Sequence, residues 1–398
     1  MAEVLLKKIN TKYCRISDTV DNIQPVLAGN ADLATFFVQN QDFQCESNTS
    51  GKKRFLTIRP KNGISFTRTD PQTTDGPVSS GTTDHVKFLA LSEPIPTPLQ
   101  GAQISATWVV NAQQTNVENN PFYQPGSPDS PDPNSDFRLA SFILNFLDFS
   151  KLTIFDFALT NNTVYVIIER LPGLESVFGN YAAYEYAIPV YYSKELCSEW
   201  HKYSISYNKC TGEVTWFIDE QPVFQFTEIG RLLRPCNAFI FRKDRFVPLK
   251  NPERYKTLDF GGEEPVVPLT LDTVQAGFGL FTILDAYLPR GGKSLYPPLV
   301  RLESARYRFG TSPFYQNPLT GGETQFIYNS VLDPTGTFYL PTIPPQIRVF
   351  GQGVRANVAQ LTVAVKNTHQ KFALGKRTSA EKSKSKKTLY YKSSSKTN

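Results

Sequence analysis

The chain lacks any long apolar run, which excludes a membrane-spanning helix. Its most apolar stretch, residues 139–149, is interrupted by Asn145 and Asp148, whereas a helix that crosses a bilayer needs about 18 or more consecutive apolar residues. The longest apolar run before the first lysines, at positions 4–6, has three residues and is too short for the core of a signal peptide. We therefore expect synthesis in the cytosol without signal-peptide export.

Cysteine and histidine are also scarce, which argues against several kinds of site. The five cysteines include no C-x-x-C pair, so neither a disulfide framework nor a structural zinc site is expected. There is no G-x-S-x-G motif, and the three histidines are scattered along the chain. We therefore expect no nucleophilic triad, no metal and no other cofactor. His201 is interpreted as a structural hydrogen-bonding residue.

The positive charge is concentrated at the C-terminus. Residues 371–398 hold nine lysine or arginine residues and one acid, a net charge of +8, so the formal net charge of +6 leaves −2 for residues 1–370. A lysine- and serine-rich segment of this kind attracts phosphates or acidic partners. We expect weak contact with nucleic acid or an acidic partner through Lys382, Lys384, Lys386 and Lys387. A localisation signal and a solvated tail remain alternatives.

The rest of the composition is that of a folded β protein. Hydrophobic residues make up 40% of the chain and aromatic residues 13%, which excludes wholesale disorder. Short β-rich runs alternate with turn-forming clusters, and only residues 228–234 suggest a short helix. The pattern predicts an all-β, two-sheet antiparallel jelly-roll sandwich, with strands over residues 103–110, 137–146, 152–159, 164–169, 184–192, 200–207, 214–218, 223–226, 277–284 and 300–309.

Composition shifts divide the chain into four segments. We predict an N-terminal segment over residues 1–33, the sandwich over 34–310, and an irregular arm rich in proline and glycine over 311–370. A last strand is expected within that arm at residues 355–366, and the basic tail over 371–398 is expected to be disordered.

One hairpin carries a resemblance to known proteins. Residues 200–203 (WHKY) and 212–219 (GEVTWFID) resemble a hairpin of the concanavalin A-like lectin and glucanase superfamily. Residues 165–172, 226–233 and 274–284 are similar to an uncharacterised family of such domains. The resemblance implies a concanavalin-like sandwich. Glu220 stands where the usual D-G turn has glycine.

Glycoside hydrolysis on such a sandwich would need two carboxylates facing one cleft. The glucanases that the chain resembles carry them as E-x-D-x-E on one strand, and no such string occurs here. Glu169 has no acidic partner two or four residues away along its own strand. We therefore predict that the protein is not an enzyme.

A weak calcium candidate lies in the proline-rich loop before residue 137. Carboxylate and amide oxygens at D-x-N-x-D spacing are ligands that hard cations prefer. The rest of an EF-hand loop is missing, because Phe137 occupies the position of its turn glycine. A solvated acidic loop is the preferred interpretation of the four residues Asp129, Asp132, Asn134 and Asp136.

The preferred function is a non-catalytic structural or binding protein, built into a large assembly such as a viral particle. The first alternative is carbohydrate binding by the concave face of the sandwich, which needs an aromatic platform with polar neighbours. The second is a glycoside hydrolase whose carboxylates come from different strands. Trp200 and Trp216 are assigned to the core. The candidate ligand-binding residues are Tyr184, Glu185, Tyr186, Glu169 and Trp108.

Overall fold

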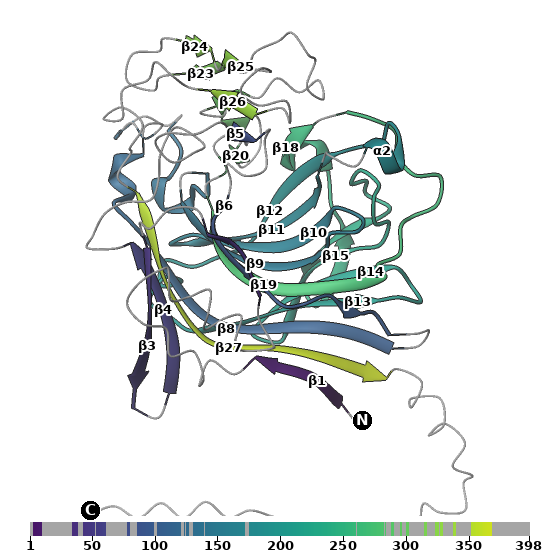
Figure 1. Ribbon diagram of the computed structural model, residues 1–398, viewed down its shortest axis with the longest axis horizontal. Helices are drawn as coiled ribbons and strands as arrows, with labels where there is room; N and C mark the ends of the chain where they lie inside the picture. The colour runs from purple at the N-terminus through teal and green to yellow at the C-terminus, as the bar shows by residue number, and fades with distance from the viewer. Residues whose placement is uncertain are drawn as a thin grey trace, which may run out of the picture.

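A computed structural model shows two large antiparallel sheets packed face to face (Figure 1). The predicted all-β jelly-roll sandwich is confirmed. The structure describes residues 3–9, 34–38, 43–51, 53–60, 78–79, 86–98, 102–120, 123, 125–126, 130–138, 140–171, 175–259, 261–281, 283, 288–289, 295–296, 300–301, 314–316, 323–325, 327–328, 337–339 and 352–367.

Sheet A contains the hairpin that carried the resemblance. Its strand order is β17-β16-β15-β14-β13-β8-β27-β4-β3, and β1 pairs with the free part of β27. The bounds are β17 Arg245–Pro248, β16 Ala238–Arg242, β15 Gln221–Phe226, β14 Glu213–Ile218, β13 His201–Asn208, β8 Ala102–Thr115, β27 Gly353–Asn367, β4 Lys53–Pro60, β3 Phe43–Ser50 and β1 Glu3–Ile9.

Sheet B packs on sheet A. Its order is β18-β12-β11-β10-β9-β19-β6-β2, and β7 pairs with β19 beside this path. The bounds are β18 Lys256–Asp259, β12 Tyr184–Tyr192, β11 Thr163–Arg170, β10 Thr153–Leu159, β9 Ser141–Asp148, β19 Thr273–Phe281, β6 Val86–Leu91, β2 Ala34–Val38 and β7 Ile95–Pro96.

The remaining elements are short. They are α2 Glu175–Phe178, the 3-10 turns η4 Val117–Asn119, η5 Pro133–Ser135 and η6 Pro252–Tyr255, and the strands β5 Val78–Ser79, β20 Leu288–Pro289, β21 Leu295–Tyr296, β22 Val300–Arg301, β23 Phe314–Gln316, β24 Glu323–Gln325, β25 Ile327–Tyr328 and β26 Thr337–Tyr339. Among the described residues, no helix is long and apolar enough to cross a membrane.

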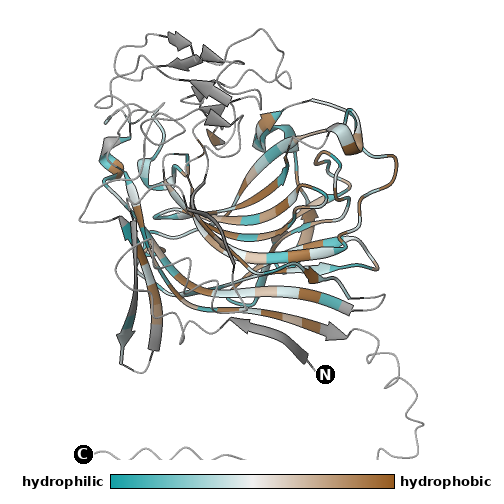
Figure 2. Cartoon of the chain, viewed as in Figure 1, coloured by the Kyte–Doolittle hydropathy of each residue, from teal (hydrophilic) through white to brown (hydrophobic). Residues whose placement is uncertain are grey.

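The core lies between the sheets because apolar residues alternate with others along the strands (Figure 2). Trp216 of β14 packs edge-on against Phe155 of β10, and its indole nitrogen donates to the Asp156 carbonyl at 3.1 Å. Trp108 of β8 donates in the same way to the Gly277 carbonyl of β19 at 2.8 Å. Both tryptophans are fully buried, so each satisfies its one polar atom while joining the two sheets.

Two sequence predictions need correction. The last strand is present as β27, but it is an interior strand of sheet A, between β8 and β4, and it pairs with β8 from Gly353 to Asn367. The sandwich therefore does not end at residue 310. Residues 228–234 form turns instead of the expected helix, and the Ile229 carbonyl accepts a bond from the Leu269 amide of a distant loop.

The turn that lacks the usual glycine keeps a hairpin geometry. Asp219 and Glu220 have φ values of 48° and 69°, and the flanking residues Ile218 and Gln221 pair with each other. Positive φ at both central residues is typical of a type I′ turn, which is the tight turn that matches the twist of paired strands. Glu220 therefore occupies a left-handed conformation that glycine would adopt at lower cost.

Candidate functional site

The outer face of sheet B, which is turned away from sheet A, collects acidic side chains from neighbouring strands. Alternation along β10, β11 and β12 directs residues such as Phe155, Val166 and Tyr184 into the core. The intervening positions lie on the outer face. They include three acids, Asp156, Glu169 and Glu185.

Strand register brings these acids close together. Glu169 of β11 pairs directly with Glu185 of β12, and Ile154, two residues before Asp156, pairs with Glu169 on its other side. Directly paired residues have Cβ atoms about 4.5–5.5 Å apart, and diagonal neighbours about 7–8 Å. Glu169 therefore gains acidic neighbours from other strands, which its own strand could not provide.

Asp156 is buried and hydrogen-bonded to the neighbouring strand β9. It is 4% exposed, and its carboxyl oxygens accept bonds from the Phe146 amide at 3.1 Å and from the Asn145 side chain at 2.7 Å. Burial raises the pKa of Asp156 well above its ordinary value, and the nearby charge of Glu185 adds to this, although the two hydrogen bonds oppose it.

Most of this face is covered, and of the three acids only Glu169 is partly exposed. The Glu185 side chain is 1% exposed and accepts a bond from the Thr257 hydroxyl at 2.6 Å. The apolar residues around the acids are equally inaccessible, since Ile143, Tyr165 and Ile167 are each less than 5% exposed. They pack in one cluster with side chains from outside the sheet, namely Phe137, Ile283 and Leu288.

The predicted aromatic platform is not on this face. Tyr184 and Tyr186 belong to the core between the sheets, and so does Trp108. The Tyr184 hydroxyl donates to the Arg231 carbonyl at 2.7 Å, and the Tyr186 hydroxyl contacts Glu253 at 3.4 Å. The expectation that these three rings bind a ligand on a concave face is corrected, because all three are buried in the core. Alternation along β12 places both tyrosines on the side opposite Glu185.

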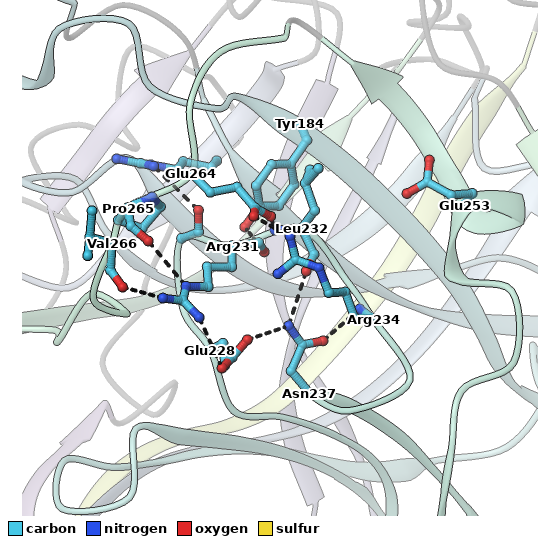
Figure 3. A network of polar contacts seen from close by, with 12 residues as sticks. Tyr184, Glu228, Arg231, Leu232, Arg234, Asn237, Glu253, Glu264, Pro265 and Val266 are labelled. Carbon is cyan, nitrogen blue, oxygen red and sulfur yellow. Dashed lines mark hydrogen bonds and ion pairs between the residues drawn. The ribbon is translucent and has the colours of Figure 1, made fainter.

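The Tyr184 contact belongs to a polar network that fixes the loop after β18 (Figure 3). The Arg231 side chain donates to the carbonyls of Pro265 and Val266 and also contacts Glu228. Arg234 forms an ion pair with Glu264 of the same loop. These contacts give the tyrosine a structural role at the end of the sandwich.

The described side chains of the calcium candidate bind other groups of the chain. Asp136 is fully buried and binds the Arg138 guanidinium with both oxygens, at 2.9 and 2.7 Å. Burial works to raise the pKa of Asp136, but the charge and hydrogen bonds of Arg138 outweigh it and lower the pKa. Asp132 accepts the Asn134 amide at 3.0 Å. Asp136 is therefore no solvated loop residue, and Asp129 lies outside the described residues.

The structure describes His201 but not the basic tail. His201 is buried, and its Nδ1 atom lies 2.7 Å from the Asp219 carboxylate in the turn between β14 and β15, which fits the predicted structural role. The basic tail with Lys382, Lys384, Lys386 and Lys387 lies outside the described residues.

Comparison with known families gives the following assignment. A model of a family of unknown function, DUF6081, matches residues 48–367. The chain belongs to this family. The DUF6081 match includes β27, which lies between β8 and β4 inside sheet A.

A viral protein and several solved structures are also similar. The uncharacterized protein L829 of Acanthamoeba polyphaga mimivirus is 25% identical over 309 residues, which is 60% of this chain and 66% of that protein. The alginate lyase AlgAT5 of polysaccharide lyase family 7 gives a TM-score of 0.31 at 7% identity, with 92% of this chain and 94% of the lyase covered. A β-1,3-1,4-glucanase from a mouse hindgut metagenome gives 0.29 at 10% identity, with 85% and 94% covered. These values support no conclusion about activity.

Proposed function

We propose that this DUF6081 protein is a non-catalytic structural or binding protein that is built into a larger assembly such as a viral particle. The observation that carries the proposal is the covered outer face of sheet B, where Asp156 and Glu185 are 4% and 1% exposed. A hydrolase needs its carboxylates at the substrate. Asp156 and Glu185 are buried, so a substrate could not reach them, and a structural role fits them better than a catalytic one.

The mimivirus relative supports the viral part of the proposal. It shares 25% identity over 309 residues and is a protein of a virus. The concanavalin-like fold implied by the resemblance of the WHKY hairpin is compatible with this role, since one fold carries many functions.

Sedimentation velocity of the full chain over a range of concentrations tests assembly. We expect species heavier than one chain that persist at about 0.5 M NaCl, where interactions between exposed charges are strongly screened. A single monomeric species at all concentrations would contradict the proposal. Complexes that dissociate at high salt would show that the tail alone causes association. This result would also contradict the proposal.

A glycoside hydrolase is the second candidate, and the three gathered carboxylates favour it. Glu169 and Glu185 are directly paired on one face of the sheet, and retaining glycosidases bring two carboxylates into one site, about 5–5.5 Å apart. Release of reducing sugars from neutral glucans, abolished by Glu185→Gln and unchanged by Glu199→Gln at an exposed site, would establish this activity. No release would leave the non-catalytic role.

A further inference from the structure

The end of sheet A formed by β14 to β17 presents an apolar surface to solvent. Alternation sends Trp216 and Ile240 into the core, and Val247 packs against the same core. The intervening positions therefore face outward, and Phe217 pairs there with Pro222 across β14 and β15. Each outward residue is at least partly exposed, and together they form what we call the aromatic patch: Phe217, Pro222, Phe239, Phe241, Phe246 and Pro248.

The β16–β17 hairpin holds most of this patch. Phe241 pairs with Phe246, and their rings meet edge-on with centroids 5.3 Å apart. Phe239 pairs with Pro248 in the same hairpin. Within the described part of the chain, none of the four phenylalanines of the patch belongs to a hydrophobic core cluster. Neighbouring apolar side chains that stay at the surface in this way mark a contact site.

A second aromatic pair of sheet A lies outside the patch. Trp200 does not belong to the core, contrary to the sequence-based assignment, and its ring meets Phe55 edge-on with ring centroids 5.4 Å apart. Trp200 directly precedes β13 and Phe55 lies on β4. In the order of the sheet, both positions are separated from the β16–β17 hairpin by β14 and β15. The aromatic patch is therefore a separate cluster.

Three cations border the patch at the tip of the β16–β17 hairpin. Arg242, Lys243 and Arg245 are exposed, and no acidic group among the described residues forms an ion pair with them. Asp244 is the one acid of this turn, so three cations and one acid leave a net charge of +2. Aromatic side chains and arginine are the residue types enriched in protein interfaces. The patch therefore suits a protein partner with apolar and acidic groups.

The loop between β18 and β19 carries these groups. Val266 and Val267 are 91% and 72% exposed. Glu263 is exposed too, and its backbone bonds to Asn180 and Ala182. Its side chain has no ion-pair partner in the described part of the chain. Residues 263–268, which we call the valine loop, therefore offer two apolar side chains and a free negative charge.

Contacts within the chain fix the valine loop in place (Figure 3). The Arg231 side chain donates to the carbonyls of Pro265 and Val266, and the Glu264 carboxylate accepts from the Leu232 amide at 2.7 Å. A proline stands on each side of the two valines, which restricts the backbone further. Because the exposed valines already have a defined position, docking them costs little conformational entropy.

From these two surfaces we infer that copies of this chain associate head to tail, with the valine loop of one copy docked on the aromatic patch of the next. The valines complement the phenylalanines, and Glu263 complements the unpaired arginines. Both surfaces are exposed within one chain, so the contact joins two chains. Since one chain carries both halves, a second copy is the partner that this complementarity selects.

A contact between two different surfaces leaves one of each free at the ends, so it continues into a ring or a filament. This property suits a component of a large assembly. The inference rests on the proposed function and names the contact through which copies would join.

Sedimentation velocity of the full chain at about 0.15 M NaCl tests this contact, because charges within about 8 Å still interact at that ionic strength. A loop variant carries Val266→Asp and Val267→Asp, and a patch variant carries Arg242→Glu and Arg245→Glu. All four side chains are exposed, so both variants keep the contacts of the fold. Each should weaken association about tenfold or more, through the lost apolar contact or through repulsion of Glu263.

Mixing the two variants tests the head-to-tail arrangement. The loop variant keeps an intact patch and the patch variant keeps an intact loop, so an equimolar mixture should form a dimer of one of each and nothing larger. Adding Glu263→Arg to the patch variant should restore its association, because opposite charges face each other again. Tyr192→Asp, at a site that is 59% exposed, and Lys194→Glu, also exposed, are matched controls. Both should sediment as the unmodified chain does.

The outcomes separate this inference from the proposed function. Association of both variants equal to that of the unmodified chain would overturn the inference and leave assembly through another surface. Loss in only one variant, with no dimer in the mixture, would indicate a two-fold contact through that surface and overturn it too. An unmodified chain that stays monomeric would overturn both the inference and the proposed function.

Discussion

The buried carboxyl of Asp156 should make stability fall as the pH rises. Its pKa in the folded protein lies well above the ordinary value, which is about 3.9 for an unfolded chain. Between these two pKa values the folded state binds a proton that the unfolded state has released. The contribution of Asp156 is therefore fully present below the unfolded pKa and is lost as the pH rises toward the folded one.

The size of this effect follows from linkage. A single proton gives a slope of at most about 1.4 kcal/mol per pH unit, with the free energy of unfolding decreasing as pH increases. The variant Asp156→Asn removes the titrating group but keeps an oxygen for the Phe146 amide, which donates to Asp156 in the unmodified protein. We expect this variant to lack that slope and to gain stability relative to the unmodified chain toward higher pH.

Urea unfolding midpoints from about pH 5 to about pH 8 measure the effect. Asp244→Asn serves as a matched control, because Asp244 is an exposed turn residue, and its profile should follow that of the unmodified chain. Parallel profiles for Asp156→Asn and the unmodified chain would refute the reasoning. An unmodified chain that becomes steadily more stable over this range would weaken it further, even if the variant did not fold.

Three further substitutions test individual features of the fold. Glu220→Gly should raise the thermal midpoint by a degree or more, because it relieves a non-glycine residue at φ 69° at a cost of only one exposed ion pair; a lower midpoint would contradict this. Gly277→Ala should lower the urea midpoint strongly, since its Cβ would lie 1.9 Å from the Ala90 carbonyl oxygen; an unchanged midpoint would show that the strands can separate. Arg138→Met should cost about 3–5 kcal/mol by leaving Asp136 buried without its cation, and a loss under about 1 kcal/mol by urea denaturation would contradict the assigned pair.

Much of the sheet structure could be predicted from alternation. The run over residues 184–192 appears as β12 with the same bounds. The runs predicted over residues 200–207, 214–218 and 223–226 appear as β13, β14 and β15, which are neighbours in sheet A. The partner of β27 could not be predicted, because Gly353 pairs with Thr115 far away in the sequence. Periodicity indicates that a strand exists, but not which strand it joins.

The placement of the candidate site residues could be predicted only in part from the sequence, and one indication in the sequence was overlooked. Alternation separates Glu185 from Tyr184 and Tyr186, so the three could not share a face. Trp200 has the same parity as Ser204, which faces outward, and this spacing could have placed the ring outside the core. The pairing of Glu169 with Glu185 depends on register between strands, which no local pattern supplies.

Chemical labelling of carboxyl groups in the folded full chain tests the covered face of sheet B most directly. Carbodiimide coupling to an amine, followed by peptide mass spectrometry, compares Asp156 and Glu185 with Glu220, whose side chain is 75% exposed. The account predicts rapid modification of Glu220 and protection of both buried acids until the protein unfolds. Modification of Glu185 in the folded chain at a rate comparable to that of Glu220 would contradict it.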